Sequence, residues 1–198
     1  MPLIPNTKFL TVFLIAGIFL VLGMAASVKM IIENQTIKRT EQQISRNFAR
    51  FKAYEVPEKL PALRFAGPDG EEVILKDYRG NLLVMNVWAT WCRPCITELP
   101  SLERLQNMTR GQNIKVIAVS VDLRKDIDKI GEFLDQHEIG AVARYHDIHG
   151  DLQDKLNPRA LPATYILDGR GRVLYEIAGE ADWSSPKIAG FLQKLAAR

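Results

Sequence analysis

The segment LLVMNVWATWCRPC, residues 82–95, decides the fold, because an almost continuous apolar run leads directly into two cysteines three positions apart. A run without polar alternation predicts a strand covered on both faces, as in the centre of a sheet. Apolar residues then recur with helical spacing from Ile96 to Met108, and Pro100 is expected to kink that helix. The two cysteines therefore lie between a central strand and the amino end of a helix.

Strand and helix signals continue to alternate on both sides of this junction. Turn residues at 67–70 and 168–171 separate two pairs of short strands, which predicts two hairpins. The other expected strands are 63–66, 71–75, 114–121, 142–145, 163–167 and 172–178, and the other expected helices are 127–134 and 184–197. This order predicts an α/β fold, with a central mixed sheet flanked by helices and an N-terminal β-hairpin extension.

Cys92 and Cys95 are the only cysteines in the 198 residues. One CxxC pair can neither form a structural disulfide framework nor supply four zinc ligands, and the three histidines have no known metal-ligand spacing. We therefore predict no metal site and no cofactor other than a redox-active disulfide between Cys92 and Cys95. The net charge of +3 reflects scattered cations without a nucleic-acid-binding motif, so nucleic acid is not expected as a partner.

The position of Cys92 at the start of a helix favours its thiolate, because unpaired backbone N–H groups and the helix dipole stabilise negative charge there. We expect its pKa to fall from about 8.5 into the range of roughly 3.5 to 7.5. Arg93 should favour the thiolate further, and Pro94 suits the first helical turn. Cys92 is thus the expected nucleophile, and Cys95, one turn further into the helix, is the expected resolving cysteine.

The motifs around the cysteines are similar to those of a known family. Residues 86–95 (NVWATWCRPC), 98–100 (ELP), 118–122 (AVSVD) and 161–168 (LPATYILD) resemble the membrane-anchored bacterial thioredoxin-like proteins of the TlpA, ResA and CcmG type. The resemblance extends from about residue 63 onward. It implies a thioredoxin-like fold and a thiol:disulfide oxidoreductase activity on protein disulfides.

The resemblance also implies roles for residues outside the cysteine pair. Pro162 would be a cis-proline that faces the pair, and Leu161 would offer backbone groups to an extended substrate segment. Trp91 is expected to shape the docking surface. The predicted substrate-binding residues are Trp91, Arg93, Pro94, Leu161 and Pro162.

One position departs from ordinary cytosolic thioredoxins. Those proteins carry a buried acid six residues before the first cysteine, whereas this chain has Asn86, which cannot exchange a proton at physiological pH. Glu98, three residues after Cys95 on the same helix, is the candidate catalytic acid–base that assists Cys95. The alternative for Glu98 is a solvent-facing helix glutamate without a catalytic role.

An uncharged apolar stretch at residues 9–28 lies near the amino terminus. Twenty residues of helix match the roughly 30 Å hydrocarbon core of a bilayer, which predicts one transmembrane anchor. A cleaved signal peptide is the alternative. The expected division of the chain is a tail at 1–8, the anchor at 9–28, a polar spacer at 29–62 and the thioredoxin-like domain at 63–198.

The spacer combines a polar composition with a weak apolar stripe at helix-compatible separations. The stripe consists of Ile37, Ile44, Phe48 and Phe51. Pro57 and Pro61 would end such a helix. A solvated stalk that continues the membrane helix is the expected role of this segment.

Two features of the chain predict opposite orientations of the anchor. More Lys and Arg residues follow the span than precede it, which favours a cytoplasmic domain. Tethered dithiol proteins, however, serve substrates outside the cytoplasm, where disulfides form. On this second ground we expect a single-pass protein of the bacterial inner membrane with its catalytic domain in the periplasm.

The expected function is reductive thiol-disulfide exchange with extracytoplasmic partners such as apocytochrome c or a copper-site assembly protein. The resemblance implies that a membrane-embedded dithiol carrier donates the electrons. A Cu(I)-binding or delivery module is the alternative, because two thiolates suit Cu(I), although no Met or His cluster accompanies them. A peroxiredoxin needs one leading cysteine in a different environment, so the CxxC pair fits dithiol exchange better.

Overall fold

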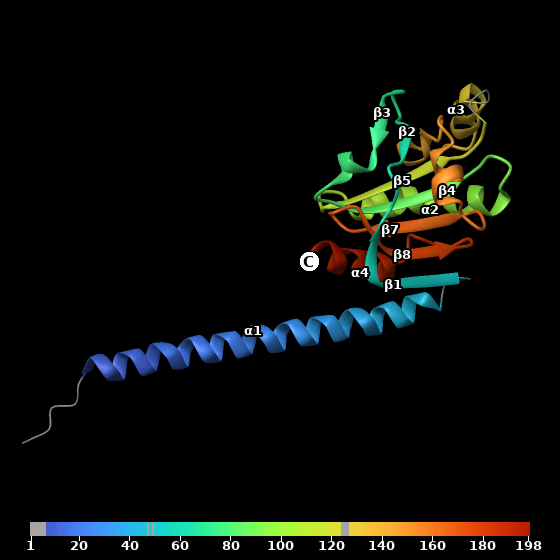
Figure 1. The fold of residues 1–198 in the computed structure, drawn as a ribbon. Coiled ribbons are helices and arrows are strands. Elements are labelled where there is room, and N and C mark those ends of the chain that lie inside the picture. Colours follow the sequence, from blue (N-terminus) through green and yellow to red (C-terminus); the bar gives the residue numbers. More distant parts are fainter. Residues whose placement is uncertain (1–6, 47, 49, 124–126) are drawn as a thin grey trace, which may run out of the picture. The chain divides into compact units, whose positions relative to one another are not determined.

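The computed structural model describes residues 7–46, 48, 50–123 and 127–198. The chain divides into two compact units, Met1–Thr40 and Glu41–Arg198. Helix α1 (Thr7–Ser45) makes up the described part of the first unit (Figure 1). Its last five residues, 41–45, belong to the second unit. Its stretch Ile15–Ser45 is long and apolar enough to cross a membrane, and side chains such as Phe19 are exposed. The predicted N-terminal apolar helix is therefore present.

The second unit is built on one mixed sheet, whose described strands follow the spatial order β1-β8-β7-β4-β5-β6-β2-β3 (Figure 1). These strands are β1 (Arg50–Lys59), β2 (Arg64–Ala66), β3 (Glu72–Ile74), β4 (Leu82–Trp88), β5 (Ile114–Ser120), β6 (Tyr145–His146), β7 (Ala163–Leu167) and β8 (Arg172–Ala178). β4 lies between β5, which is parallel to it, and β7, which is antiparallel. The predicted mixed sheet and central strand are confirmed, and the two predicted hairpins are β2–β3 and β7–β8.

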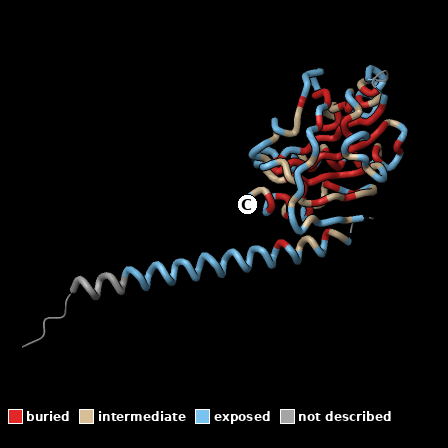
Figure 2. The backbone as a smooth tube through the Cα atoms, viewed as in Figure 1, coloured by how far each residue is buried: buried red, intermediate tan, exposed pale blue. Residues whose placement is uncertain are grey.

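The core of the second unit surrounds β4, all seven residues of which are buried (Figure 2). Helices cover the sheet, as the unbroken apolar run of β4 requires. Besides α1, the described helices are α2 (Arg93–Met108), α3 (Ile127–Gln136) and α4 (Pro186–Ala196), with shorter helical turns η1 (Leu75–Tyr78), η3 (Ala141–Ala143) and η4 (Leu152–Leu156). Helix α2 packs against β5, and α4 packs against β4 and β5. The cysteines therefore sit at the end of the most buried strand.

The amino-terminal edge of the sheet differs from the prediction. Residues 50–59, expected in the spacer, form edge strand β1, which pairs antiparallel with β8. The predicted helical stripe through Phe51 is therefore wrong beyond Ser45, where α1 ends. The Phe51 ring packs instead on Tyr175 of β8, with ring centroids 5.3 Å apart. Pro57 lies where the β1–β8 register shifts, a place that tolerates its missing N–H.

The strand expected at residues 142–145 is shorter and lies later in the chain. Ala141–Ala143 form the helical turn η3, and only Tyr145–His146 form β6. His146 pairs with Ser120 of β5 on one side and with Ala66 of β2 on the other. A strand of two residues is therefore enough to join the hairpin extension to the central sheet.

Candidate active site

The cysteine pair lies in the turn that connects β4 to α2. Cys92 is the N-cap residue of α2, and its sulfur accepts a hydrogen bond from the backbone N–H of Cys95 at 3.3 Å. The two residues form a disulfide, with Sγ–Sγ 2.01 Å and Cα–Cα 5.3 Å. Cys92 is 6% exposed, whereas Cys95 is fully buried. An incoming thiol therefore meets Cys92 first, and a thiolate at Cys92 would keep the hydrogen bond from the Cys95 N–H at the positive end of the helix dipole.

A carboxylate from the neighbouring strand holds the turn before the cysteines. β4 and β5 are parallel and end together at Trp88 and Ser120, so Asp122, just beyond β5, lies beside the turn. Asp122 accepts one hydrogen bond from the backbone N–H of Thr90 at 2.9 Å and another from the Thr90 hydroxyl at 2.7 Å. The Ser120 hydroxyl donates a third at 2.6 Å. These contacts fix the backbone that leads into Cys92.

An open groove of about 760 Å³ runs past the disulfide. Its lining combines residues 91–94 with Gln153, Asn157 and Leu161. Trp91 is 70% exposed at its rim. The Leu161–Pro162 peptide bond is cis, and Pro162 is buried next to the lining. The groove thus brings together Cys92 and four of the five predicted substrate-binding residues, with Pro162 adjacent to them.

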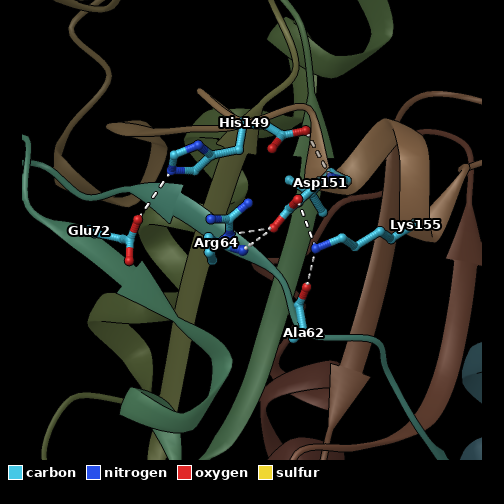
Figure 3. Close-up of polar contacts among 8 residues, drawn as sticks. Ala62, Arg64, Glu72, His149, Asp151 and Lys155 are labelled. Carbon is cyan, nitrogen blue, oxygen red and sulfur yellow. Dashed lines mark hydrogen bonds and ion pairs between the residues drawn. The ribbon is translucent and has the colours of Figure 1, made fainter.

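Polar contacts tie the η4 part of the groove wall to the hairpin extension. Asp151 accepts hydrogen bonds from the backbone N–H of Arg64 at 3.0 Å and from its Nε at 3.1 Å (Figure 3). Lys155 forms an ion pair with Asp151 at 2.9 Å and donates a hydrogen bond to the carbonyl of Ala62 at 2.9 Å. The hydrogen bonds from Arg64 lower the pKa of Asp151 to about 2. The segment that carries Gln153 is therefore anchored on two sides.

The Glu98 carboxylate lies one helical turn after Cys95 and is only 2% exposed. Its Oε1 accepts a hydrogen bond from Asn86 Nδ2 at 2.6 Å. Its Oε2 accepts hydrogen bonds from the backbone N–H of Ala181 at 3.0 Å and from Trp183 Nε1 at 3.3 Å. Burial raises the pKa of Glu98 to about 7, although these hydrogen bonds act in the opposite direction. The alternative of a solvent-facing glutamate is therefore wrong, and Glu98 can exchange a proton near neutral pH.

Asn86 lies at the centre of the polar cluster around Glu98. Its Nδ2 also donates a hydrogen bond to the Thr164 hydroxyl at 2.9 Å, across the β4–β7 ladder in which the two residues face each other. Its Oδ1 is buried without a hydrogen-bond partner among the described residues. The position that holds an acid in cytosolic thioredoxins therefore holds an amide that contacts the acid of this chain.

Most of this cluster has no local sequence signal. Ala181 and Trp183 reach Glu98 from a loop 83 and 85 residues further along the chain. From the sequence alone, packing explains Trp183 as well as any polar role does. Asn86 has one available signal, because it is a lone polar side chain within an apolar strand.

A model of the AhpC/TSA family matches residues 56–176, more than half of the chain. The chain belongs to the AhpC/TSA family. In this AhpC/TSA protein the matched part contains β4, both cysteines, Glu98 and the cis peptide bond before Pro162. Trp183 lies beyond it.

Relatives of this AhpC/TSA protein include thiol-disulfide oxidoreductases named ResA. ResA of Geobacillus kaustophilus is 31% identical over 137 residues, which cover 67% of this chain and 74% of the relative. ResA of Bacillus cereus is 26% identical over 148 residues, which cover 75% of this chain and 83% of the relative. The predicted resemblance to ResA-type proteins is confirmed. The chain is a thiol-disulfide oxidoreductase with a CxxC pair.

Solved structures similar to this AhpC/TSA protein support the predicted thioredoxin-like fold. A secreted thiol-disulfide isomerase from Corynebacterium glutamicum matches with a TM-score of 0.61 at 18% identity, over 75% of this chain and 92% of that chain. A thiol:disulfide interchange protein of the thioredoxin family from Chlorobium tepidum matches with a TM-score of 0.58 at 16% identity, over 73% of this chain and 99% of that chain. At these identities the likeness establishes the fold.

Proposed function

We propose that this chain is a membrane-tethered oxidoreductase that reduces disulfides of extracytoplasmic partner proteins through Cys92 and Cys95. The observation that carries this proposal is the unequal placement of the two sulfurs. Cys92 caps α2 at the edge of an open groove, and Cys95 is buried behind it. Cys92 can therefore react with a partner, while Cys95 is kept for the attack that resolves the mixed disulfide.

The reaction consists of two exchanges that start from the reduced protein. The Cys92 thiolate attacks one sulfur of the substrate disulfide; the substrate S–S bond breaks, a mixed disulfide forms, and the other substrate sulfur leaves and takes up a proton. Cys95 then loses its proton and attacks the Cys92 sulfur, which releases the second substrate thiol and restores the Cys92–Cys95 disulfide. Two electrons and two protons thus pass to the substrate. A membrane-embedded dithiol carrier then supplies two electrons and two protons to the Cys92–Cys95 disulfide and restores the dithiol.

Glu98 is the proposed proton acceptor for Cys95 in the second exchange. It follows Cys95 by one turn of α2, and both residues are buried from water. A pKa of about 7 leaves protonated and ionised forms of Glu98 available at physiological pH, which suits a group that must take a proton and give it back. Asn86 holds the carboxylate through its 2.6 Å hydrogen bond and acts as a positioning residue.

The groove is the proposed binding site for the substrate segment. Trp91 offers an exposed apolar surface, and Arg93 and Pro94 flank the reactive sulfur. Leu161 and Pro162 would align an extended segment through the backbone of the loop that carries the cis bond. Backbone pairing of this kind is independent of side-chain identity, so it suits partners that share a cysteine rather than a long sequence motif.

The proposed cellular setting is the periplasmic face of a bacterial inner membrane. The exposed apolar side chains of α1 favour insertion into lipid, because they have no apolar cover in the described chain. Protein disulfides form and persist outside the cytoplasm, which is where a reductant for them is needed. Apocytochrome c or a copper-site assembly protein is the proposed class of substrate.

Trapping of the mixed disulfide tests this function directly. The full-length Cys95→Ser variant, produced in its own host, should accumulate adducts with partner proteins that run as larger bands on non-reducing gels and disappear with dithiothreitol. Mass spectrometry of these bands identifies the partners. A membrane-impermeant maleimide should label free Cys92 of this variant in spheroplasts without lysis.

Two controls make the trapping result decisive. Cys92→Ser and the double variant Cys92→Ser/Cys95→Ser should give no adducts, because the nucleophile is absent. Adducts that persist equally in Cys92→Ser would contradict the assignment of the nucleophile. Extraction of the full chain by alkaline carbonate, or labelling only after lysis, would contradict the tether or the proposed orientation.

A further inference from the structure

A second cavity opens beside the active-site groove, at the sheet edge where β1 pairs with β8. Its volume is about 340 Å³. The charged residues that line it are Arg50, Lys52, Arg159 and Glu176. Ala160 lines both this cavity and the groove that runs past the disulfide, so the two adjoin each other. A segment bound in the groove can therefore continue into the cavity.

The single carboxylate does not neutralise the cations of this cavity. Oε2 of Glu176 accepts a hydrogen bond from the Tyr54 hydroxyl at 2.9 Å and lies 3.8 Å from Lys52 Nζ. The charge of Glu176 is therefore offset by Lys52, which also contacts Tyr54. Within the described part of the chain, the guanidinium groups of Arg50 and Arg159 have no hydrogen-bond or ion-pair partner. They remain available to an external anion.

The active-site groove extends this positive surface. Arg93 lines the groove and is exposed, and no Asp or Glu is among the described residues of the lining. No ion pair involves Arg93 in the part of the chain that the structure describes. Unpaired guanidinium groups therefore line both the groove that contains Cys92 and the cavity that adjoins it at Ala160.

Strand register gives the spacing between Arg50 and the start of β7, just after Pro162. Ala163, which follows Pro162, pairs with Ala178 of β8, and Ala178 pairs with Arg50 of β1. Neighbouring strands are about 4.8 Å apart, so the Arg50 backbone lies about 10 Å from that of Ala163. An extended segment advances about 3.3 Å per residue, so about three residues cover this separation.

On the basis of the redox function proposed above, we propose that this surface selects substrate segments that carry acidic side chains about three to five residues from the reactive cysteine. The substrate cysteine meets Cys92 in the groove, and an Asp or Glu side chain reaches Arg50 and Arg159 in the adjoining cavity. Guanidinium groups suit this task because they bind carboxylates through two parallel hydrogen bonds. Exposed pairs contribute modestly one by one, so the surface tunes the choice of partner and the rate of association.

Matched peptides test this selection with the reduced full chain in detergent micelles. Each peptide contains one cysteine activated as a mixed disulfide with 5-thio-2-nitrobenzoate, and release of the chromophore reports the second-order rate constant. Three peptides carry Glu, Gln or Lys at the third to fifth positions on both sides of the cysteine. The Glu peptide is expected to react on the order of tenfold faster than the Lys peptide at low salt, and the ratio should approach one at about 0.5 M salt.

Paired variants distinguish an effect of the cavity arginines from an effect of the protein's net charge. Arg50→Gln/Arg159→Gln should reduce the ratio of the rate constants for the Glu and Lys peptides to about twofold or less. This residual preference is what Arg93, the remaining guanidinium of this surface, can contribute. Lys187→Gln/Lys194→Gln removes the same charge from exposed positions of α4 and should keep the full ratio. Equal rates for the Glu and Lys peptides, or equal loss of the ratio in both variants, would overturn the selection. Failure of every peptide to react would instead refute the redox function itself.

Discussion

Nδ2 of Asn86 donates a hydrogen bond to Oε1 of Glu98 at 2.6 Å, in a part of the core where both residues are buried. Oδ1 of the same amide has no partner among the described residues. A half-turn of the amide would bring Oδ1 towards Glu98 and the Thr164 hydroxyl, both of which now contact Nδ2. Asn86 can therefore donate to the carboxylate or accept from the carboxylic acid, and the pair keeps its hydrogen bond in both protonation states.

The raised pKa of Glu98 makes the stability of the protein depend on pH. Native Glu98 holds its proton up to about pH 7, whereas an unfolded glutamate loses it near pH 4.5, so folding takes up a proton between these values. The stability of the wild type should therefore fall as the pH rises through this window, relative to Glu98→Gln, by on the order of 3 kcal/mol. Urea unfolding of both full chains in detergent, from about pH 4.5 to pH 8, measures the difference.

Glu98→Gln is a matched comparison because the neutral amide can use the same partners. Its oxygen can accept from Ala181 and Trp183, and its Nε2 can donate to a rotated Asn86. A stability difference between wild type and variant that stays constant across this pH range would show that Glu98 has the same pKa in both folded and unfolded states.

Asn86→Asp would place a second carboxylate within hydrogen-bond distance of Glu98. Two buried carboxylates this close cannot both ionise at low cost, so one of them should retain its proton well above neutral pH. We expect a loss of stability of about 2 to 4 kcal/mol at pH 8 and a smaller loss at pH 5. In the Glu98→Gln background the loss at pH 8 should be smaller, because the burial of one carboxylate remains but the repulsion between two is removed; an unchanged loss would place its origin outside the Asn86–Glu98 pair.

Trp183→Phe should raise the pKa of Glu98 further, because Trp183 Nε1 donates a hydrogen bond that favours the charged carboxylate. The loss of this bond is expected to lower stability by about 1 to 3 kcal/mol. Trp88→Phe is the control, since Trp88 is equally buried but its Nε1 has no partner among the described residues. NMR titration of the ¹³C-labelled Glu98 carboxyl should give a higher pKa in Trp183→Phe than in the wild type, and an unchanged pKa in Trp88→Phe. Equal titrations would refute the polar role of Trp183.

Asp151→Asn should loosen the groove wall at η4. Because its native pKa is lowered to about 2, Asp151 stabilises the fold above about pH 4, and this contribution is lost as the pH falls towards 2. We expect the variant to be about 1 to 2 kcal/mol less stable at pH 7 and to approach the wild type near pH 2. Asp154→Asn, at an exposed position of the same segment, is the control. Similar unfolding curves for both variants at pH 7 would contradict the anchoring role.

The sequence was sufficient for the parts of the fold that depend on local periodicity. The apolar run at 82–88 is the buried β4, and the turn signals at 67–70 and 168–171 separate the two hairpins. Edge strand β1 could not be predicted in this way, because its position depends on pairing with β8 more than a hundred residues later. Its aromatic residue Phe51 has a helix-compatible spacing from Phe48. The strand conformation at Phe51 is favoured only by tertiary contacts such as the one with Tyr175.

The site shows the same division between local and distant information. The cysteine spacing and the helix start were enough to place Cys92 at the N-cap and Cys95 behind it. The environment of Glu98 was not predictable, because burial and two of its donors come from a loop 83 to 85 residues away. Asn86 stood out as a departure from a known pattern and as a lone polar residue in an apolar strand, and the structure supplies the reason by pairing it with Glu98.

Equilibration of the full chain with glutathione buffers of stepped potential tests the central claim most directly. We predict that Cys92 and Cys95 convert between dithiol and disulfide in one reversible two-electron transition, quantified by acid quenching and alkylation, and that Cys92→Ser shows no such transition. A pair that stays in one state across the series, or that forms only glutathione adducts without closing on itself, would contradict the proposed exchange mechanism.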